Sequence, residues 1–271
     1  MNPINNSELF KEFLEYGKLV STKVIDCHTH MHAVGDASTP VSSEEDCIKL
    51  MDEENIEMIW CSTHEDLFTC ATNINEGTFN FVNRFAGRVK GYYVFNPNKK
   101  KNYINSLGKI LENDNFIGVK FLPNYHNHAL EGAGYREVLD FSDEHKLIVL
   151  SHTWGDKPQN GIANVKEMIK AHKDLFLILG HSAPGDLDGA IEVVKKHDNV
   201  YLDICDIHRH SGIIEKMVNA VGSKRVLFGT DMPWYDPNYA IGSVLCAKIT
   251  DEEKKNILYN NAKNLLNRSK K

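Results

Sequence analysis

The sequence has no CxxC pair, and its six cysteines lie scattered over 271 residues. Such spacing is typical of reduced thiols in a cytoplasmic protein, so we expect no disulfide framework. No apolar run approaches the roughly 20 residues that a membrane-spanning helix needs, and we therefore expect no membrane partner. Glu8, Lys11 and Glu12 interrupt the first apolar stretch, which is not the pattern of a secretory signal.

Arginine is also scarce. The chain has six arginines, a formal net charge of −6 and no stripe of basic residues. A nucleic-acid-binding surface needs concentrated positive charge, so we expect no nucleic-acid partner. The hydrophobic content of 42% and the charged content of 25% are ordinary for a globular protein with a sizeable core. A homo-oligomer is compatible with this size, although no interface pattern stands out in the sequence.

Eight short apolar runs rich in β-branched residues recur along the chain, at steps of about 25 to 35 residues. Helical patterns separate them, which predicts parallel strands covered by helices on their outer face. Eight such units close most simply into a (β/α)8 barrel. We expect a single domain over residues 1–271, in which residues 1–22 form a helical extension. The runs span residues 24–28, 56–62, 89–95, 116–122, 147–152, 175–181, 200–206 and 225–231.

Local signals place helices between these runs. Either of two serines, Ser42 and Ser43, can cap the helix that follows them. Thr250 and Glu253 match a capping box at the start of the last helix. The spacing of apolar residues predicts a further helix over residues 7–19, ahead of the barrel.

Reactive side chains gather at the ends of the predicted strands, which is where such a barrel carries its active site. His28 and His30 are two residues apart on the first strand and point to the same face, roughly 6.6 Å apart along it, so both can approach one ion. Imidazoles combined with one carboxylate suit zinc or another divalent transition metal. The residues at the strand ends are His28, His30, Lys120, His152, His181 and Asp231.

The motifs DCHTH, LSH, GH and GTDMP on successive predicted strands resemble the amidohydrolase superfamily. They are most similar to its branch of amidohydrolase-related hydrolases, lactonases and aminocarboxymuconate-semialdehyde-type decarboxylases. The resemblance covers residues 24–267 and implies a metal-dependent barrel enzyme that acts on a small-molecule substrate. By this resemblance, one metal ion is held by His28, His30, His152 and Asp231, and His181 lies beside it as a catalytic residue.

The expected ion is one Zn²⁺, with Mn²⁺, Co²⁺ and Fe²⁺ as alternatives that accept the same ligands. A bound divalent ion lowers the pKa of its water from 15.7 towards about 7. Asp231 can then take the proton and deliver it to the leaving group, while His181 orients the water or polarises a carbonyl. We therefore expect hydrolysis of an amide, lactone or ester bond. In a structural alternative, His181 is a core histidine and Asp231 a turn residue before Met232 and Pro233.

Two other functions stay open. In the resembled branch, the same metal frame also carries out non-oxidative decarboxylation, which here would act on a small aromatic or enolic carboxylic acid. Many decarboxylases of the branch begin with Glu-x-His, whereas His28 and His30 form a His-x-His pattern, which the semialdehyde decarboxylases share. The third alternative is a barrel that binds metal or ligand without catalysis, because a fold alone does not establish an activity.

Lys120 has three alternative roles. Binuclear members of the superfamily carry a carboxylated lysine near this strand end, which bridges two metals. An unmodified Lys120 could instead pair with Asp231 or with a substrate anion. A lysine that points outward into the helix layer is the third alternative, because a short motif match is weak evidence by itself. This choice decides between one metal ion and two.

Loop residues after the strands are expected to bind the substrate, since loops on such barrels carry the variable, functional positions. Their aromatic rings, histidines and one arginine favour a small polar or anionic ligand, and a ring would fit them. His64 and Glu65 can also reach the pocket, and Asp203 can either support the site or pack inside the barrel. The expected substrate-binding residues are Lys120, Tyr125, His126, Trp154, Arg209 and Trp234.

Overall fold

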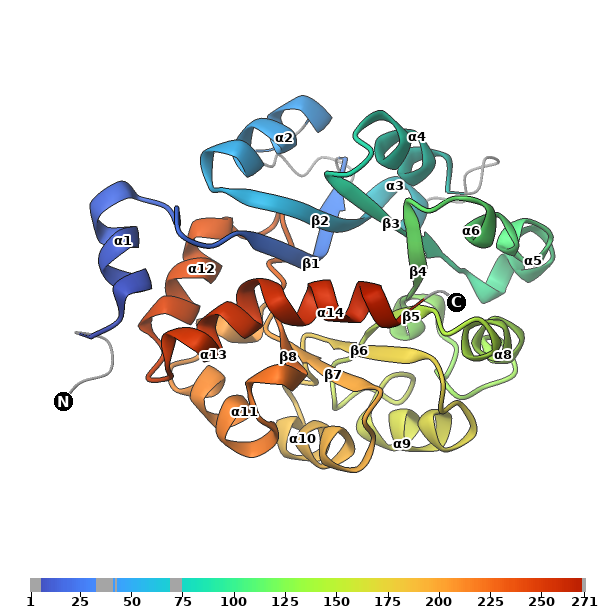
Figure 1. The fold of residues 1–271 in the computed structure, drawn as a ribbon. Helices are drawn as coiled ribbons and strands as arrows, with labels where there is room; N and C mark the ends of the chain where they lie inside the picture. Colours follow the sequence, from blue (N-terminus) through green and yellow to red (C-terminus); the bar gives the residue numbers. More distant parts are fainter. Residues whose placement is uncertain (1–5, 33–40, 42, 69–74, 270–271) are drawn as a thin grey trace.

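The strands of the computed structural model form one eight-stranded parallel sheet in the order β1 to β8 (Figure 1). The structure describes residues 6–32, 41, 43–68 and 75–269. Helices alternate with the strands and cover the outer side of the sheet, so the predicted (β/α)8 barrel is confirmed. The strands are β1 (Val24–Met31), β2 (Ile56–Thr63), β3 (Val89–Val94), β4 (Phe116–Phe121), β5 (Ile148–His152), β6 (Phe176–Gly180), β7 (Val200–Asp203) and β8 (Val226–Leu227).

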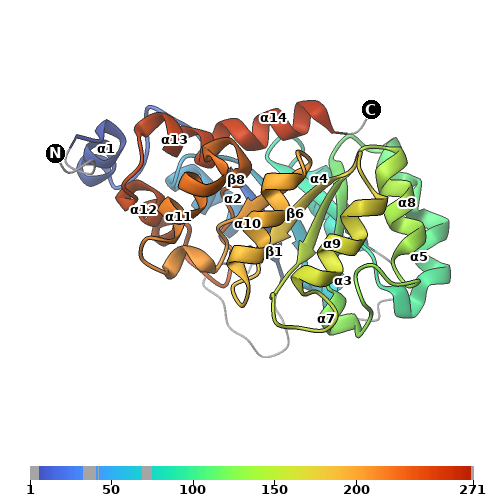
Figure 2. The same cartoon turned by 90° about the horizontal axis from the view of Figure 1, so that it is seen from below.

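The helices surround the barrel in both views (Figures 1 and 2). They are α1 (Glu8–Tyr16), α2 (Glu44–Glu53), α3 (His64–Phe68), α4 (Glu76–Arg84), α5 (Lys100–Leu107), α6 (Lys109–Glu112), α7 (Pro123–His126), α8 (Arg136–Glu144), α9 (Ile162–Ala171), α10 (Leu187–Lys196), α11 (Ile213–Val221), α12 (Pro237–Cys246), α13 (Asp251–Lys255) and α14 (Asn261–Arg268). A π-helical turn, Asn256–Asn260, joins α13 to α14.

The predicted caps are present where the structure describes them. The Ser43 side chain caps α2, and Thr250 and Glu253 form the capping box of α13. Ser42, the other candidate cap of α2, lies outside the described residues. The first helix is shorter than the predicted range, because it begins after its N-cap and ends at Gly17, whose φ of 70° suits glycine.

The last strands are shorter than their apolar runs predict, and the barrel closes by an irregular seam. Regular pairing of β8 stops at Leu227, yet the chain continues alongside β1. The Cys27 amide donates to the Phe228 carbonyl at 2.9 Å, and the Asp231 amide donates to the His28 carbonyl at 2.8 Å. These bonds join the first and last strands without a regular ladder, so the segment after β8 is free to turn its side chains into the barrel.

Apolar side chains fill the inside of the barrel and the layer between strands and helices. The inner cluster holds Ile25, Trp60 and Leu150, all fully buried. Ala262 and Leu265 of α14 pack against this cluster, and α14 lies across the front of the barrel in Figure 1. One end of the barrel is therefore covered by a helix. In such barrels the side chains at the other end, where the strands finish, form the active site.

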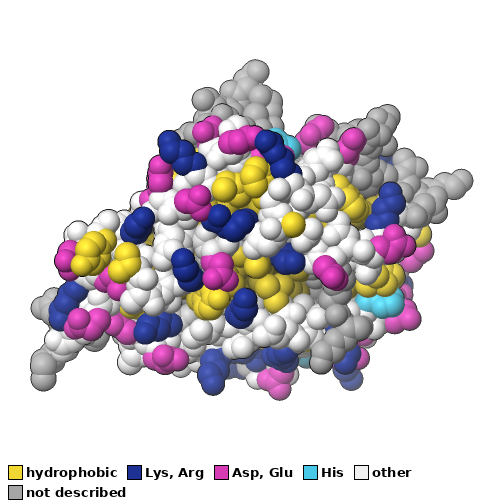
Figure 3. All heavy atoms as spheres, turned by 45° about the horizontal axis from the view of Figure 1, so that its top comes forward, with side chains coloured by type: hydrophobic (Ala, Val, Ile, Leu, Met, Phe, Trp, Pro, Cys, Tyr) yellow, Lys and Arg dark blue, Asp and Glu magenta, His cyan; other side chains and the backbone are white. Residues whose placement is uncertain are grey.

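The face in Figure 3 carries mixed charge. Basic and acidic side chains are interspersed on it, with apolar side chains between them. Within the described residues, no helix combines the length and the apolar character that crossing a membrane requires.

Asp26 supports the seam, and its removal is expected to destabilise the fold. Its buried carboxyl accepts hydrogen bonds from the His28 amide at 3.1 Å, the Thr230 amide at 3.2 Å and the Thr230 hydroxyl. An Asp26→Ala variant leaves these donors unpaired, and each buried unpaired group costs about 1–3 kcal/mol. We expect the free energy of unfolding to fall by at least about 3 kcal/mol, measured by urea denaturation.

The matched control is Asp188→Ala on α10, where the side chain is 81% exposed and pairs with Lys216. Exposed ion pairs contribute at most about 1 kcal/mol, so this variant should unfold close to wild type. Equal midpoints for the Asp26 and Asp188 variants would show that the seam does not depend on Asp26.

Candidate active site

Two histidines of β1 present the same ring nitrogen towards one carboxylate. The Nδ1 atom of His28 lies 2.7 Å from Asp203 Oδ2, and the Nδ1 atom of His30 lies 2.9 Å from the Ser62 carbonyl oxygen. Their Nε2 atoms lie 3.6 Å and 3.2 Å, respectively, from Asp231 Oδ1. Metal-binding histidines have this arrangement, in which one nitrogen donates to a carboxylate or carbonyl and leaves the other to the ion. Asp203 thus supports the site, one of the two roles expected for it.

Asp231 reaches the histidines from the irregular segment after β8. Its backbone has a φ of 64°, in the left-handed region, and its amide bonds the His28 carbonyl. The chain can pass so close because Gly229 has no Cβ, which would lie 2.9 Å from the His28 Cβ atom. Burial favours a higher pKa for the Asp231 carboxyl, but the hydrogen bond from His30 and the nearby His28 and His181 hold that pKa well below its usual range. Asp231 is therefore ionised at neutral pH.

His152 and His181 face each other from β5 and from the residue that follows β6. His181 Nε2 lies 3.1 Å from His152 Nδ1, and their ring centroids are 4.6 Å apart. Burial lowers the pKa of both histidines, with further lowering of His152 by His181. Both imidazoles are therefore neutral at pH 7, the form in which a histidine can bind a metal or donate from one nitrogen.

Cys205, which the sequence did not single out, joins this cluster. Its Sγ atom lies 3.3 Å from His181 Nδ1. Within the described part of the chain, His28, His181, Cys205 and Asp231 form the one group whose possible ligand atoms all lie within 4.8 Å of one another. This group shares His28 and Asp231 with the predicted ligands. The sequence signal that could have found Cys205 was its spacing from Asp203, because residues two apart on a strand point to the same face.

Lys120 on β4 points into the site and not into the helix layer. It is fully buried, and its Nζ atom lies 2.8 Å from His28 Nε2. Burial lowers the pKa of Lys120, and the nearby Asp231 partly offsets that effect, so that the pKa is about 8. The ammonium therefore lies among the groups expected to hold the metal.

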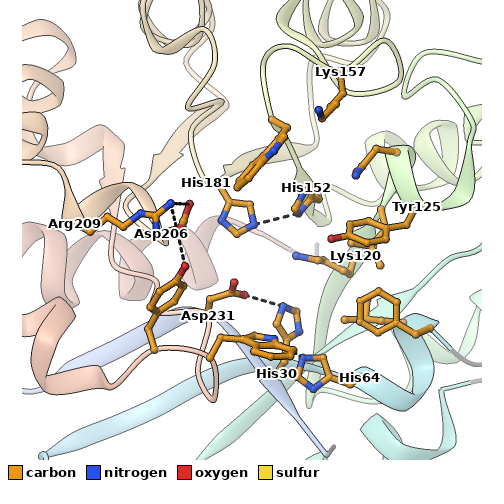
Figure 4. A pocket seen from close by; sticks show the side chains of 17 residues that line it. His30, His64, Lys120, Tyr125, His152, Lys157, His181, Asp206, Arg209 and Asp231 are labelled. Atoms are coloured by element: carbon orange, nitrogen blue, oxygen red, sulfur yellow. Dashed lines mark hydrogen bonds and ion pairs between the residues drawn. The ribbon is translucent and has the colours of Figure 1, made fainter. Parts of the chain in front are cut away.

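A cavity of about 690 Å³ opens over these groups at the end of the barrel where the strands finish (Figure 4). Five of the six residues expected to bind substrate line it, namely Lys120, Tyr125, Trp154, Arg209 and Trp234. The sixth, His126, is not brought to the cavity. It is buried elsewhere, with its Nδ1 atom 2.7 Å from the Tyr135 hydroxyl. His64 lines the cavity, as considered possible, whereas Glu65 is not among the lining residues.

The mouth of the cavity has two further polar residues that the sequence did not single out. Asp206 and Tyr235 line it, and the Tyr235 hydroxyl donates to Asp206 Oδ1. Arg209 Nη2 lies 3.3 Å from the same carboxylate. On another wall, Trp234 Nε1 donates to His64 Nε2 at 2.9 Å, which fixes the indole. Tyr235 follows Trp234 and Asp206 lies three residues before Arg209, both predicted site residues, but nothing in the spacing indicated that Asp206 and Tyr235 would bond to each other.

Comparisons with known proteins agree with this architecture. A family model described as Amidohydrolase matches residues 25–268. No curated protein sequence shows significant similarity to the chain. Among solved structures, an uncharacterized TIM-barrel protein from Bordetella bronchiseptica is similar with a TM-score of 0.75 at 17% identity, over 91% of this chain and 99% of that one.

Two similar structures are decarboxylases. A dihydroxybenzoic acid decarboxylase from Polaromonas sp. JS666, with bound manganese and the inhibitor 2-nitroresorcinol, has a TM-score of 0.73 at 16% identity, over 91% of this chain and 97% of that one. A 5-carboxyvanillate decarboxylase from Novosphingobium aromaticivorans, complexed with manganese and a nitrobenzoic acid, has a TM-score of 0.72 at 12% identity, over 91% and 96%. At these identities the likeness shows the fold.

Proposed function

The chain belongs to the amidohydrolase family, and on that basis we propose that it is a metal-dependent enzyme that removes carbon dioxide, without oxidation, from a small aromatic or enolic carboxylic acid. The observation that carries this proposal is the composition of the cavity. Lys120, Lys157 and Arg209 supply positive charge to it. Its walls also carry aromatic rings, among them those of Trp154 and Trp234. A flat acid suits such walls better than an extended peptide or a neutral ester.

The residues present fit a divalent metal ion. Two imidazoles whose Nδ1 atoms are bonded elsewhere converge with Asp231, an ionised carboxylate, which is the donor chemistry that such ions take. We propose His28, His30, His152 and Asp231 as the ligands. A divalent ion there supplies Lewis-acid charge to a substrate oxygen as negative charge develops.

Decarboxylation replaces the carboxylate of the substrate by a proton. The bond between the carbon and the carboxylate breaks, carbon dioxide leaves, and the carbon takes a proton in its place. Asp231 is held ionised, so it must first accept a proton at a carboxylate oxygen before it can deliver one. A hydroxyl of the substrate can supply that proton, which is why a hydroxylated aromatic or an enolic acid fits this site.

The neutral histidines orient the substrate in this proposal. His181 lies beside His152, and both line the cavity with Asp231. An imidazole N–H aimed at an oxygen on which charge develops stabilises that charge. We propose His181 as a catalytic residue for this reason, in agreement with its expected role.

Hydrolysis of an amide, lactone or ester is the second candidate, and it was the function expected from the sequence alone. The ionised state of Asp231 favours it, since a carboxylate can accept the proton of an attacking water. The similar solved structures favour decarboxylation, because two of those described above act as decarboxylases on aromatic acids.

Carbon dioxide release is the test. Protein loaded separately with Mn²⁺ and Zn²⁺ is incubated with a panel of hydroxybenzoic and enolic acids, and carbon dioxide is measured together with the decarboxylated product. We expect stoichiometric release from at least one acid, which a chelator abolishes. The same preparations are assayed against amides, lactones and esters. Hydrolysis in that second panel, with no carbon dioxide from the first, would replace the proposal by the second candidate.

A further inference from the structure

The lining of the cavity has more positive charge than one substrate carboxylate can neutralise. Three cationic side chains line it, Lys120, Lys157 and Arg209, against two carboxylates, Asp206 and Asp231. These five groups leave a surplus of one positive charge, and a bound divalent ion would raise that surplus to three. A monocarboxylate would leave most of that charge uncompensated in a partly enclosed space, where charges interact more strongly than in water.

Arg209 is held in place at the mouth. It ends the 3-10 turn that follows Asp206, and residues three apart in such a turn lie on the same side. Asp206 has a side chain that is only 7% exposed, and it is bonded by both Arg209 and the Tyr235 hydroxyl. A buried carboxylate with two partners has little freedom, so the guanidinium that it bonds is oriented before any ligand arrives.

Part of the guanidinium remains available. Within the described residues, its contacts with Asp206 involve Nη2, and the Arg209 side chain is 49% exposed. Nε and Nη1 can therefore bind a carboxylate from the ligand, and a planar guanidinium does so with two parallel hydrogen bonds. Figure 4 shows Arg209 and Asp206 together on one wall, with Lys120 and Tyr125 on the other side of Asp231 and His181.

We propose that the substrate is a ring acid with a second acidic group, and that Arg209 determines this specificity by binding the second group at the mouth. This inference rests on the proposed function for the first group, whose carboxylate lies over Asp231 and His181. The second group meets Arg209 on the β7 side of the cavity, and Asp206 and Tyr235 act as positioning residues that orient the guanidinium.

Equilibrium binding tests this proposal without turnover. Benzoate and benzene-1,3-dicarboxylate are titrated into metal-loaded protein by calorimetry. We expect the diacid to bind about 10- to 100-fold more tightly, the range of a charged hydrogen bond. In Arg209→Met the affinities for the two acids should come within about twofold of each other, since both then meet only the same inner groups. Arg136→Met, which removes an exposed arginine of α8, is the matched control and should keep the preference.

Equal affinity of the two acids for the wild-type protein would overturn the proposal, and so would equal weakening of both in Arg209→Met. Arg209→Lys provides a second variant if the methionine variant does not fold. It keeps the charge and loses the planar fork, so the preference should shrink without vanishing. Carbon dioxide release from a monoacid, without a preference for the diacid, would remove this inference and retain the decarboxylase. A preference for the diacid, without carbon dioxide release from any acid, would retain the binding role of Arg209 and remove the decarboxylase.

Discussion

Replacing Asp231 by asparagine is expected to lower kcat by about 10²- to 10⁴-fold, the contribution typical of a positioned acid–base group. Asparagine keeps the shape and one oxygen of the side chain, but it cannot accept and return a proton. The hydrogen bond from the backbone N–H of residue 231 to the His28 carbonyl should also persist, because the side chain takes no part in it. The measurement is the initial rate of carbon dioxide release from the best acid of the panel, with metal content determined on the same sample.

Asp188→Asn on α10 serves as the control for this variant, because its exposed side chain does not line the cavity and its rate should match wild type. An Asp231→Asn protein that retains its metal and more than a tenth of the wild-type rate would exclude the role in proton transfer, since such a loss is below the range for acid–base groups. A variant that loses both metal and rate would show that Asp231 is needed as a ligand, and the proton transfer would then have to be tested by its pH dependence.

A double variant, His28→Ala with His30→Ala, is expected to lose nearly all bound metal. Wild-type protein purified without chelators should carry about one ion per chain, measured by elemental analysis, because the converging Nε2 atoms and Asp231 offer one site. His210→Ala, which removes an exposed histidine, should keep the ion. Metal content in the double variant equal to that of wild type would mean that the ion is held elsewhere.

Two further single variants decide which donors complete the site. If His152 is a ligand, His152→Ala loses metal and Cys205→Ser keeps it. The opposite outcome would assign the ion to the compact group that contains His181 and Cys205. Two ions per chain would assign Lys120 the bridging role, which requires carboxylation of its Nζ atom.

Periodicity made the fold predictable. Parallel strands buried on both faces are apolar along their whole length, so the eight runs were visible in the sequence and each became a strand. Their ends were less predictable. The run over residues 225–231 is apolar from Val226 to Phe228, but β8 stops at Leu227 because the following segment bonds β1 irregularly.

The direction of a side chain was predictable where a strand positions it, whereas loop residues could be assigned only by their place after a strand, which located most of them but not their orientation. His28, His30 and Lys120 lie on strands, and their inward direction follows from the alternation of side chains. His126 lies on the short helix α7, whose rotation decides whether its imidazole faces the cavity or Tyr135. Asp206 and Arg209 meet through a 3-10 turn that no spacing rule indicated.

The seam between β1 and the segment after β8 also links ligand binding to folding. His28 and Asp231 are 203 positions apart in the chain, yet they are joined by a backbone hydrogen bond at that seam. An ion held by both residues, as proposed, would bind only chains whose first and last strands have met. Mass action then adds its binding free energy to the stability of the native state, about 2.7 kcal/mol when the free ion stands at 100 times its Kd. Depleting the ion should therefore destabilise the barrel first at the junction of its first and last strands.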